Sequence, residues 1–223
     1  MSDLGPQISR IRDKLGLAGR ADPEGTAFGA AHHRHRLGPP LGEADVAAFE
    51  AGHGISLPSG YRAFLTQVGY GLPRHVPAAS YGGGRAGAGP YYGLLPVLTD
   101  WEMVDGATLA EPPVLPDHPD AAAIRTAFEA EDMEDALFDQ LEAQLHNGLL
   151  ALCHEGCSAY TALVVSGPHR GQLVGVSLDM MGELFPLDPD IDFLGWYESW
   201  LDAVIRGPVA EHDFPGTVYL IRR

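Results

Sequence analysis

The chain has 223 residues, a formal net charge of −16 and a sequence pI near 4.8. This charge argues against nucleic-acid binding, because neutralising phosphates requires clustered Lys and Arg, and it favours a protein partner with a basic surface. Two cysteines, Cys153 and Cys157, are too few for a disulfide framework. Because no apolar run has the length of a signal peptide or a membrane helix, we expect a cytoplasmic protein.

The N-terminal segment, residues 1–36, predicts a short helix followed by a histidine-rich loop. Ile8, Ile11 and Leu15 have the spacing of one helix face. The loop holds a cluster of three histidines: His32, His33 and His35. Either the cluster binds nickel or zinc adventitiously, or it belongs to a solvated loop or edge strand, which we favour. The segment is either part of the main domain, expected over residues 37–223, or appended to it.

Two short helices joined by a proline are expected next. The first begins near Glu43 and ends at Gly52 and Gly54. Pro58 suits the first turn of the second helix, because its missing N–H would be unpaired there anyway. The second helix carries an apolar stripe of Tyr61, Phe64, Leu65 and Val68. We interpret the joint as scaffold that turns both helices towards one core.

Negative charge is concentrated between Asp100 and His146, where thirteen carboxylates face one arginine, Arg125. Residues 120–146 predict a long acidic helix, or two helices, with an apolar stripe of Ile124, Phe128, Met133, Leu137, Leu141 and Leu145. The acidic face is either simply solvated or complements a basic partner and steers its association. In the second interpretation the partner-binding residues are Glu129, Glu131, Asp132, Glu134, Asp135 and Asp139.

The C-terminal half predicts a sheet and a closing helix. Apolar runs at 149–153, 160–166, 172–177 and 183–187 are separated by turns of hairpin length, which favours an antiparallel or mixed meander. Ala162–Val165 is apolar on both faces and predicts a central strand covered by helices. Asp192 is the expected cap of a last helix that packs on the sheet, and 217–223 is a candidate terminal strand. Together these elements predict an α+β fold.

Three further stretches were weighed as functional sites. Cys153, His154 and Cys157 suggest a zinc site or a thiol nucleophile, but a fourth ligand and an orienting group are missing, so we favour a structural hairpin. The glycine-rich run at 81–89 lacks the lysine and hydroxyl of a phosphate-binding loop. The aromatic turn is either an interface anchor or buried against the sheet; its residues are Pro90, Tyr91 and Tyr92.

Three ordered motifs resemble the SUKH superfamily, which includes fungal cell-wall synthesis regulators and bacterial immunity proteins. The first is LGPPLGEADVAAFEAGHGISLPSGYRAFLTQVG, with Phe49, Pro58 and Phe64 among its matching positions. The second is GAGPYYGLLPV, and the third is the hairpin EGCSAYTALVVSGPHRGQLVG with DFLGWYESWLD after it. The likeness runs from about Leu37 to Asp202. It is interrupted by the insertion GLPRHVPAASYGGGR, and Tyr70 stands where the family has Asn.

This resemblance implies a protein-binding module without catalytic residues or cofactor. Bacterial members are commonly immunity proteins that bind and block a cognate toxin, so the leading hypothesis is an immunity protein whose partner is a toxin with a basic surface. The second hypothesis is a regulatory or scaffold protein of the same family with a non-toxin partner. An enzyme that uses Cys157 or the histidines is the least favoured reading, because no nucleophile, base and oxyanion set is evident from the sequence.

Overall fold

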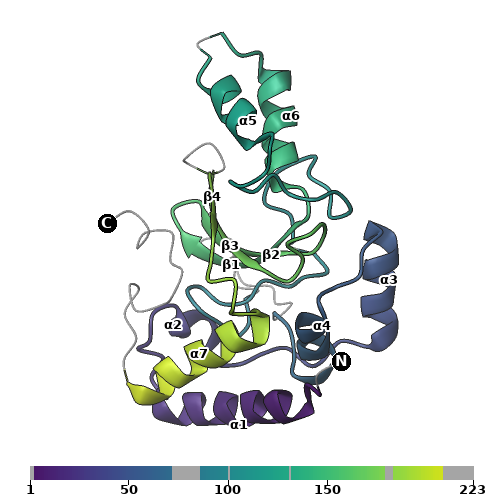
Figure 1. Ribbon diagram of the computed structural model, residues 1–223. Helices are drawn as coiled ribbons and strands as arrows, with labels where there is room; N and C mark the ends of the chain where they lie inside the picture. The colour runs from purple at the N-terminus through teal and green to yellow at the C-terminus, as the bar shows by residue number, and fades with distance from the viewer. Residues whose placement is uncertain (1–2, 72–85, 100, 131, 179–182, 208–223) are drawn as a thin grey trace.

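A four-stranded antiparallel sheet in the order β1-β2-β3-β4 forms the centre of the fold (Figure 1). The computed structural model describes residues 3–71, 86–99, 101–130, 132–178 and 183–207. The strands are β1 Leu149–Gly156, β2 Ala159–Val164, β3 Leu173–Ser177 and β4 Glu183–Pro186. The helices are α1 Gly5–Ala21, α2 Ala30–His33, α3 Glu43–His53, α4 Ser59–Gln67, α5 Ala121–Phe128, α6 Asp135–His146 and α7 Phe193–Arg206. The predicted α+β class and antiparallel meander are confirmed.

The strand β2 lies in the interior of the sheet. In β2, Ala162 is opposite Ala151 of β1 and Val174 of β3, so β2 is an interior strand as predicted. Side chains alternate between the two faces of the sheet. Leu163 belongs to the cluster on the helical side, while Val164 belongs to the cluster on the opposite side.

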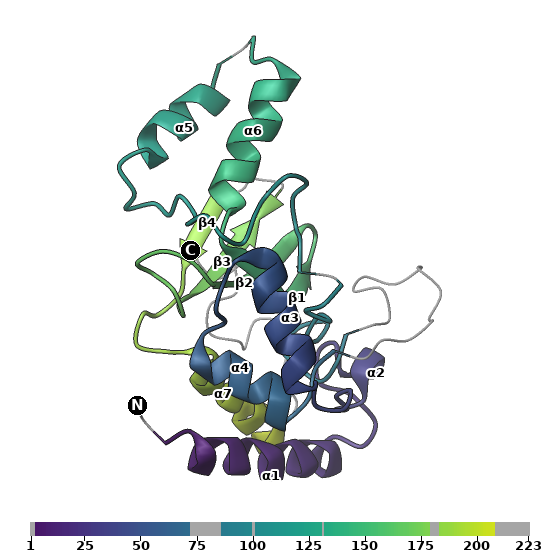
Figure 2. The ribbon, with the colours of Figure 1, turned by 90° about the vertical axis from the view of Figure 1, so that its right-hand side faces the viewer.

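Within the described ranges, helices cover one face of the sheet but not the other. Figures 1 and 2 show α1, α4 and α7 on one side and the α5–α6 pair on the other. On that second side the sheet residues pack against Leu115 and Met103, which lie in the segment before α5. The expectation that helices cover both faces of the central strand is therefore wrong for one face. Apolar side chains from an irregular segment bury that face instead.

The joint between α3 and α4 works as scaffold. Gly54 ends α3 with a left-handed φ of 66°, a conformation that suits glycine. The Glu50 carboxylate accepts a hydrogen bond from the Leu57 N–H at 2.8 Å and pairs with Arg62 Nε at 3.3 Å. Glu50 therefore connects α3 to the extended link and to α4, and Pro58 is the N-cap of α4 rather than its first residue.

The N-terminal helix packs against the C-terminal helix. Ile8 and Ile11 of α1 belong to the same buried cluster as Trp200 of α7. Lys14 pairs with Glu198 at 2.9 Å and with Asp202 at 2.7 Å, which adds an ionic contact along the α1–α7 interface. This packing supports the proposal that residues 1–36 are part of the domain.

The closing helix begins and packs as predicted. The Asp192 carboxylate accepts a hydrogen bond from Gly195 N at 2.8 Å, which caps the first turn of α7. Apolar side chains are buried along the length of α7, among them Trp196, Tyr197 and Leu201. The predicted strand at 217–223 and most of the insertion after Tyr70 lie outside the described residues. Within the described part of the chain, no helix is long and apolar enough to cross a membrane.

Candidate protein-binding surface

The acidic segment forms a helical hairpin that stands off the rest of the molecule. Figures 1 and 2 both show α5 and α6 extending away from the sheet on the side opposite α1 and α7. Neither helix packs extensively against another helix or strand. The expected helical segment at 120–146 contains two helices, α5 and α6, and the Glu129 and Asp132 carboxylates between them would repel each other within one continuous helix.

The hairpin leaves large apolar side chains in solvent. Leu137 is 44% exposed and Phe138 is 37% exposed. Phe138 contacts Phe128 of α5 edge to face, with ring centroids 5.2 Å apart. Of the predicted apolar stripe, only Ile124 is buried, among the residues that the structure describes. The helical pattern was predicted correctly, but its apolar side is only partly used for packing.

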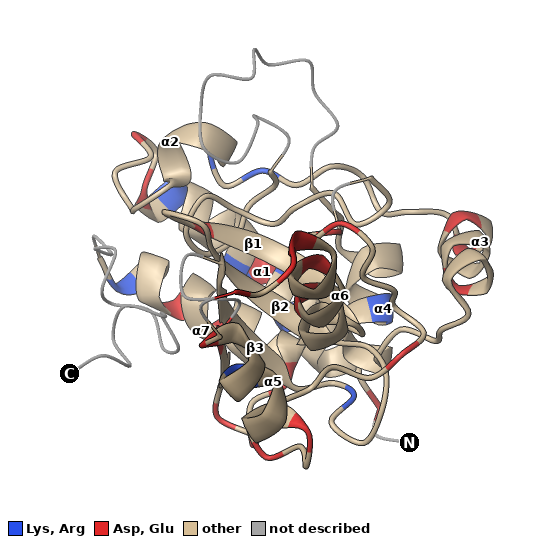
Figure 3. Cartoon of the chain, turned by 90° about the horizontal axis from the view of Figure 1, so that it is seen from above, with Lys and Arg blue, Asp and Glu red and all other residues tan. Residues whose placement is uncertain are grey.

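The predicted acidic residues lie on α6 and in the segment that joins α5 to α6. Glu129, Asp132, Glu134, Asp135 and Asp139 are all exposed, and Glu131 lies outside the described residues. Figure 3 shows acidic residues on α6 and on the segments next to α5 and α6.

These carboxylates are not neutralised locally. Among the described residues, the ion pairs in this part of the structure join His118 to Asp120 and His169 to Asp117, and both carboxylates precede α5. Burial raises the pKa of Glu142, and the nearby Asp139 carboxylate raises it further. Asp139 and Glu142, on one face of α6, therefore repel each other. Neither forms an ion pair with a cation within the described chain.

The aromatic turn does not join the acidic hairpin. Pro90 and Tyr91 are buried, and Tyr91 is only 1% exposed. Tyr92 is half-buried and its N–H donates to the His154 carbonyl at 3.3 Å, towards the end of β1. Because α6 leads into the opposite end of β1, at Leu149, the structure does not bring Tyr92 and the acidic residues into one surface.

The cysteine segment lies in the β1–β2 hairpin. Burial raises the pKa of the Cys153 thiol, which opposes its use as a nucleophile. Burial also lowers the pKa of His154, whose Nδ1 accepts a hydrogen bond from Gly156 N at 3.0 Å. Cys157 is exposed. Across the described ranges, no group of three or more His, Cys, Asp or Glu side chains is placed to hold a metal ion.

Two of the three N-terminal histidines are buried, contrary to the expected solvated loop or edge strand, whereas His32 is exposed. His33 and His35 are buried beside Trp200, and His33 ends the short helix α2. His35 Nε2 lies 2.9 Å from Asp22 Oδ2. Burial, and secondarily the neighbouring His35, lowers the pKa of His33 to about 3. His33, His35 and Asp22 therefore form a buried polar junction between the end of α1 and α7.

Sequence reasoning missed Asp22 as the centre of this junction. Its carboxylate accepts from the backbone N–H groups of Thr26 and Ala27 at 2.7 and 3.0 Å. Burial raises its pKa, but the hydrogen bonds from Ala27, Thr26 and His35 outweigh burial and hold the pKa below its usual value. No local pattern relates Asp22 to a histidine thirteen residues later, so only the fold reveals the contact.

The family comparison matches residues 40–192 to the SMI1 / KNR4 family (SUKH-1). Because this match covers more than half of the chain, the protein belongs to that family. The match includes the α3–α4 joint, the acidic hairpin and the sheet, and it ends before α7. No curated protein and no solved structure matches the chain significantly.

Proposed function

We propose that this protein is a non-catalytic binding module that neutralises a cognate bacterial toxin in the cytoplasm. Its family membership is consistent with a binding role, and the resemblance to bacterial immunity proteins supports a toxin as the partner. Neither an enzymatic role nor a cofactor is part of the proposal. The acidic residues of α6 and of the segment that joins it to α5, Glu129 to Asp139, would face a basic surface of the toxin.

One observation carries the proposal: α5 and α6 form a projecting hairpin that exposes both large apolar side chains and carboxylates for which the described residues show no ion pair. Leu137 and Phe138 contribute little to the core, and the like charges of Asp135 and Asp139, one helical turn apart, oppose helix stability. Exposed apolar groups ringed by charge are typical of interfaces, where the apolar part excludes water and the charged rim steers the partner.

The aromatic turn, residues 90–92, is less accessible to the proposed toxin than the hairpin is. Pro90 and Tyr91 would need a rearrangement to touch a partner, since both are buried. Tyr92 retains an accessible edge next to Phe28, whose ring centroid is 5.3 Å away. If the toxin also contacts Tyr92, it reaches around the sheet from the hairpin to the far end of β1.

The proposal is tested by co-expressing the chain with the toxin encoded by a neighbouring gene and scoring growth rescue and co-purification. The key variant carries Asp132→Lys, Glu134→Lys and Asp135→Lys. A control with the same total charge change carries Asp13→Lys, Glu24→Lys and Asp190→Lys, which are exposed and lie away from the hairpin.

The hairpin variant should lose rescue and slow association by about tenfold or more at low salt, because steering depends on local charge. The control variant should keep both. Full rescue and unchanged, salt-independent association of the hairpin variant would contradict the proposed surface. Absence of any complex with the wild-type chain would contradict the proposed function.

A further inference from the structure

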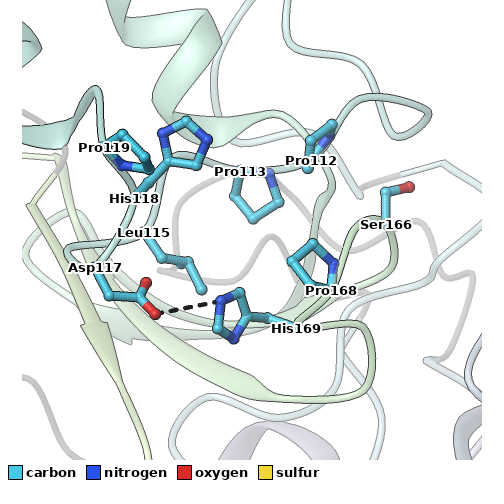
Figure 4. A pocket seen from close by; sticks show the side chains of 9 residues that line it. All are labelled: Pro112, Pro113, Leu115, Asp117, His118, Pro119, Ser166, Pro168 and His169. Carbon is cyan, nitrogen blue, oxygen red and sulfur yellow. Dashed lines mark ion pairs between the residues drawn. The ribbon is translucent and has the colours of Figure 1, made fainter.

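A small pocket lies at the base of the acidic hairpin (Figure 4). It is formed between the segment that leads into α5, residues 112–119, and the turn that joins β2 to β3, residues 166–169. Its volume is about 230 Å³. This is below the roughly 300–1,000 Å³ of typical small-molecule sites, so the pocket suits one side chain of a partner better than a whole metabolite.

The walls of the pocket are apolar and stiff. Four prolines and one leucine supply them: Pro112, Pro113, Pro119, Pro168 and Leu115. A proline ring fixes its own backbone φ angle, so these walls have little freedom to collapse or to reorganise. Leu115 is 1% exposed and belongs to the cluster under the sheet, which anchors this wall to the core.

The segment before α5 fits closely against the turn after β2. A Cβ on Gly167, whose φ is 78°, would lie 2.6 Å from Pro112 Cβ. The Ser166 hydroxyl donates a hydrogen bond to the Leu109 carbonyl. These contacts hold the two sides of the pocket together.

The same turn is also fixed to the α3–α4 joint. Arg170 donates to the carbonyls of Ser56 and Leu57 at 2.8 and 2.7 Å. A pocket held in this way is preformed, and a ligand that enters it loses less free energy to ordering the protein.

The edge of the pocket is charged. Asp117 Oδ2 lies 3.4 Å from His169 Nε2, and their side chains are 67% and 33% exposed. Figure 4 shows these two side chains meeting across the pocket from opposite walls. The site therefore combines an apolar slot with a carboxylate that remains accessible to solvent.

From this combination we propose that the pocket receives an arginine side chain of the protein partner. The aliphatic stem would lie over the prolyl rings, and the guanidinium would reach the Asp117 carboxylate. Arginine suits the site better than lysine, because its planar group binds a carboxylate in a bidentate manner and stacks on flat rings such as His169. This inference rests on the proposed function, and it names the anchoring contact of that interface.

Charge complementarity supports a cationic occupant. The pocket leads directly into α5, and the described part of the hairpin, residues 117–146, carries one arginine, Arg125, against eight carboxylates. An anionic side chain would enter this field against repulsion, whereas a cation would be drawn to it. Arg170, the cation nearest in sequence to the pocket wall, is bound to backbone carbonyls on the far side of the turn.

The test uses Nα-acetyl-arginine amide as the probe, titrated into the full-length chain and followed by NMR of Leu115 methyl and His169 ring signals. The uncharged analogue Nα-acetyl-citrulline amide is the matched probe. Asp117→Asn is the diagnostic variant. Asp120→Asn is its control, since it also removes a carboxylate paired with a histidine, His118 at 3.8 Å, but does not line the pocket.

We expect saturable shifts with the arginine probe, and affinity reduced by about threefold to fivefold in Asp117→Asn, the upper range for an ion pair near solvent. The Asp120→Asn chain should bind the probe as the wild type does. Equal shifts with the citrulline probe, or tighter binding of Nα-acetyl-tyrosine amide, would overturn the arginine assignment.

Measuring toxin binding by the same variants distinguishes a failure of the pocket inference from a failure of the proposed function. If Asp117→Asn leaves toxin binding unchanged while the hairpin reversals abolish it, the pocket inference fails and the proposed function stands. If the arginine probe binds in an Asp117-dependent manner but no toxin binds, the proposed function fails instead. Weaker toxin binding by Asp117→Asn, with the Asp120→Asn chain unaffected, supports both.

Discussion

Helices with similar apolar patterns lie on the two sides of the sheet, but their apolar side chains are buried on one side and partly exposed on the other. On the side of α4 and α7, Phe64 is fully buried and contacts Phe193 and Tyr197, with ring centroids 5.1 and 4.7 Å apart. On the other side, Leu137 and Phe138 of α6 are 44% and 37% exposed. Apolar residues at helical spacing therefore predict a helix, but not whether its apolar face is buried. We infer that the helices on the first side stabilise the fold and that the exposed residues of the α5–α6 hairpin are available for binding.

The largest expected effect is a difference in the free energy of unfolding between substitutions on the two sides. Phe64→Ala should lower the free energy of unfolding by about 3–5 kcal/mol, because it removes a fully buried ring and leaves a cavity. Phe138→Ala should cost less than about 1 kcal/mol, since much of that ring already contacts water. Urea denaturation of both variants measures the difference. Equal losses would show that the hairpin is part of the stabilising core.

The free energy of unfolding should depend on pH through the buried histidines, above all through His33, which lies beside Trp200 on the helical side of the sheet. Burial lowers the pKa of His33 to about 3. The imidazole therefore takes up a proton near pH 6.5 in the unfolded chain, but stays neutral at that pH in the folded chain. Stability should thus fall as the pH drops below 6.5, by about 2 kcal/mol between pH 7 and pH 5. Burial lowers the pKa of His146 too and acts in the same direction.

Denaturation of the wild-type, His33→Gln and His32→Gln chains at pH 7, 6 and 5 checks this expectation. His33→Gln should flatten the dependence whatever its effect at pH 7, because Gln does not titrate. The exposed His32 serves as the control, and its variant should follow the wild type. Parallel curves for wild type and His33→Gln would exclude His33 as a source of the acid sensitivity.

The N-terminal caps of α7 and α6 should differ in their contribution to stability, by less than the core substitutions do. Asp192 accepts a hydrogen bond from Gly195 N at the start of α7, whereas Glu134, in the same position before α6, makes no side-chain cap bond. Asp192→Ala should cost about 1 kcal/mol, and Glu134→Ala should cost less. Thermal denaturation gives both values. A larger loss for Glu134 would mean that α6 depends on its first turn more than the structure indicates.

Regular elements were predictable because local chemistry determines them. The proline at 58, the glycine at 54 and the Asp192 cap mark helix ends through their own backbone and hydrogen-bonding properties. The strands followed from short apolar runs between turns. The acidic run between 129 and 139 was also evident from residue type, and its role in binding a partner stays a prediction.

Contacts between distant segments were not predictable. Nothing in the sequence relates Asp117 to His169 or Asp22 to His35, because these pairs meet only when the sheet and α1 are in place. The prolines around residue 115 indicated an irregular segment, but its role as a cover for the sheet depends on Leu115 reaching the core. The fold also decided that Tyr91 is buried while Tyr92 keeps an exposed edge, a choice that the sequence left open.

The smallest expected effect concerns the charges of the hairpin. Asp139 raises the pKa of Glu142, so the two carboxylates repel each other across one turn of α6. Asp139→Asn should therefore stabilise the chain, by about 0.2–0.5 kcal/mol at low salt, and the gain should shrink as salt screens the charges. NMR titration should also show the pKa of Glu142 moving down towards its ordinary value.

Asp13→Asn on α1 is the matched control for this change, because Asp13 is exposed and lies one turn from Arg10 rather than from a carboxylate. That variant should gain nothing. If Asp139→Asn is stabilising and yet slows association with the toxin, the hairpin retains a charge that costs stability and serves binding. If Asp139→Asn is destabilising, the acidic face contributes to the fold, and the contrast between the two sides of the sheet is lost.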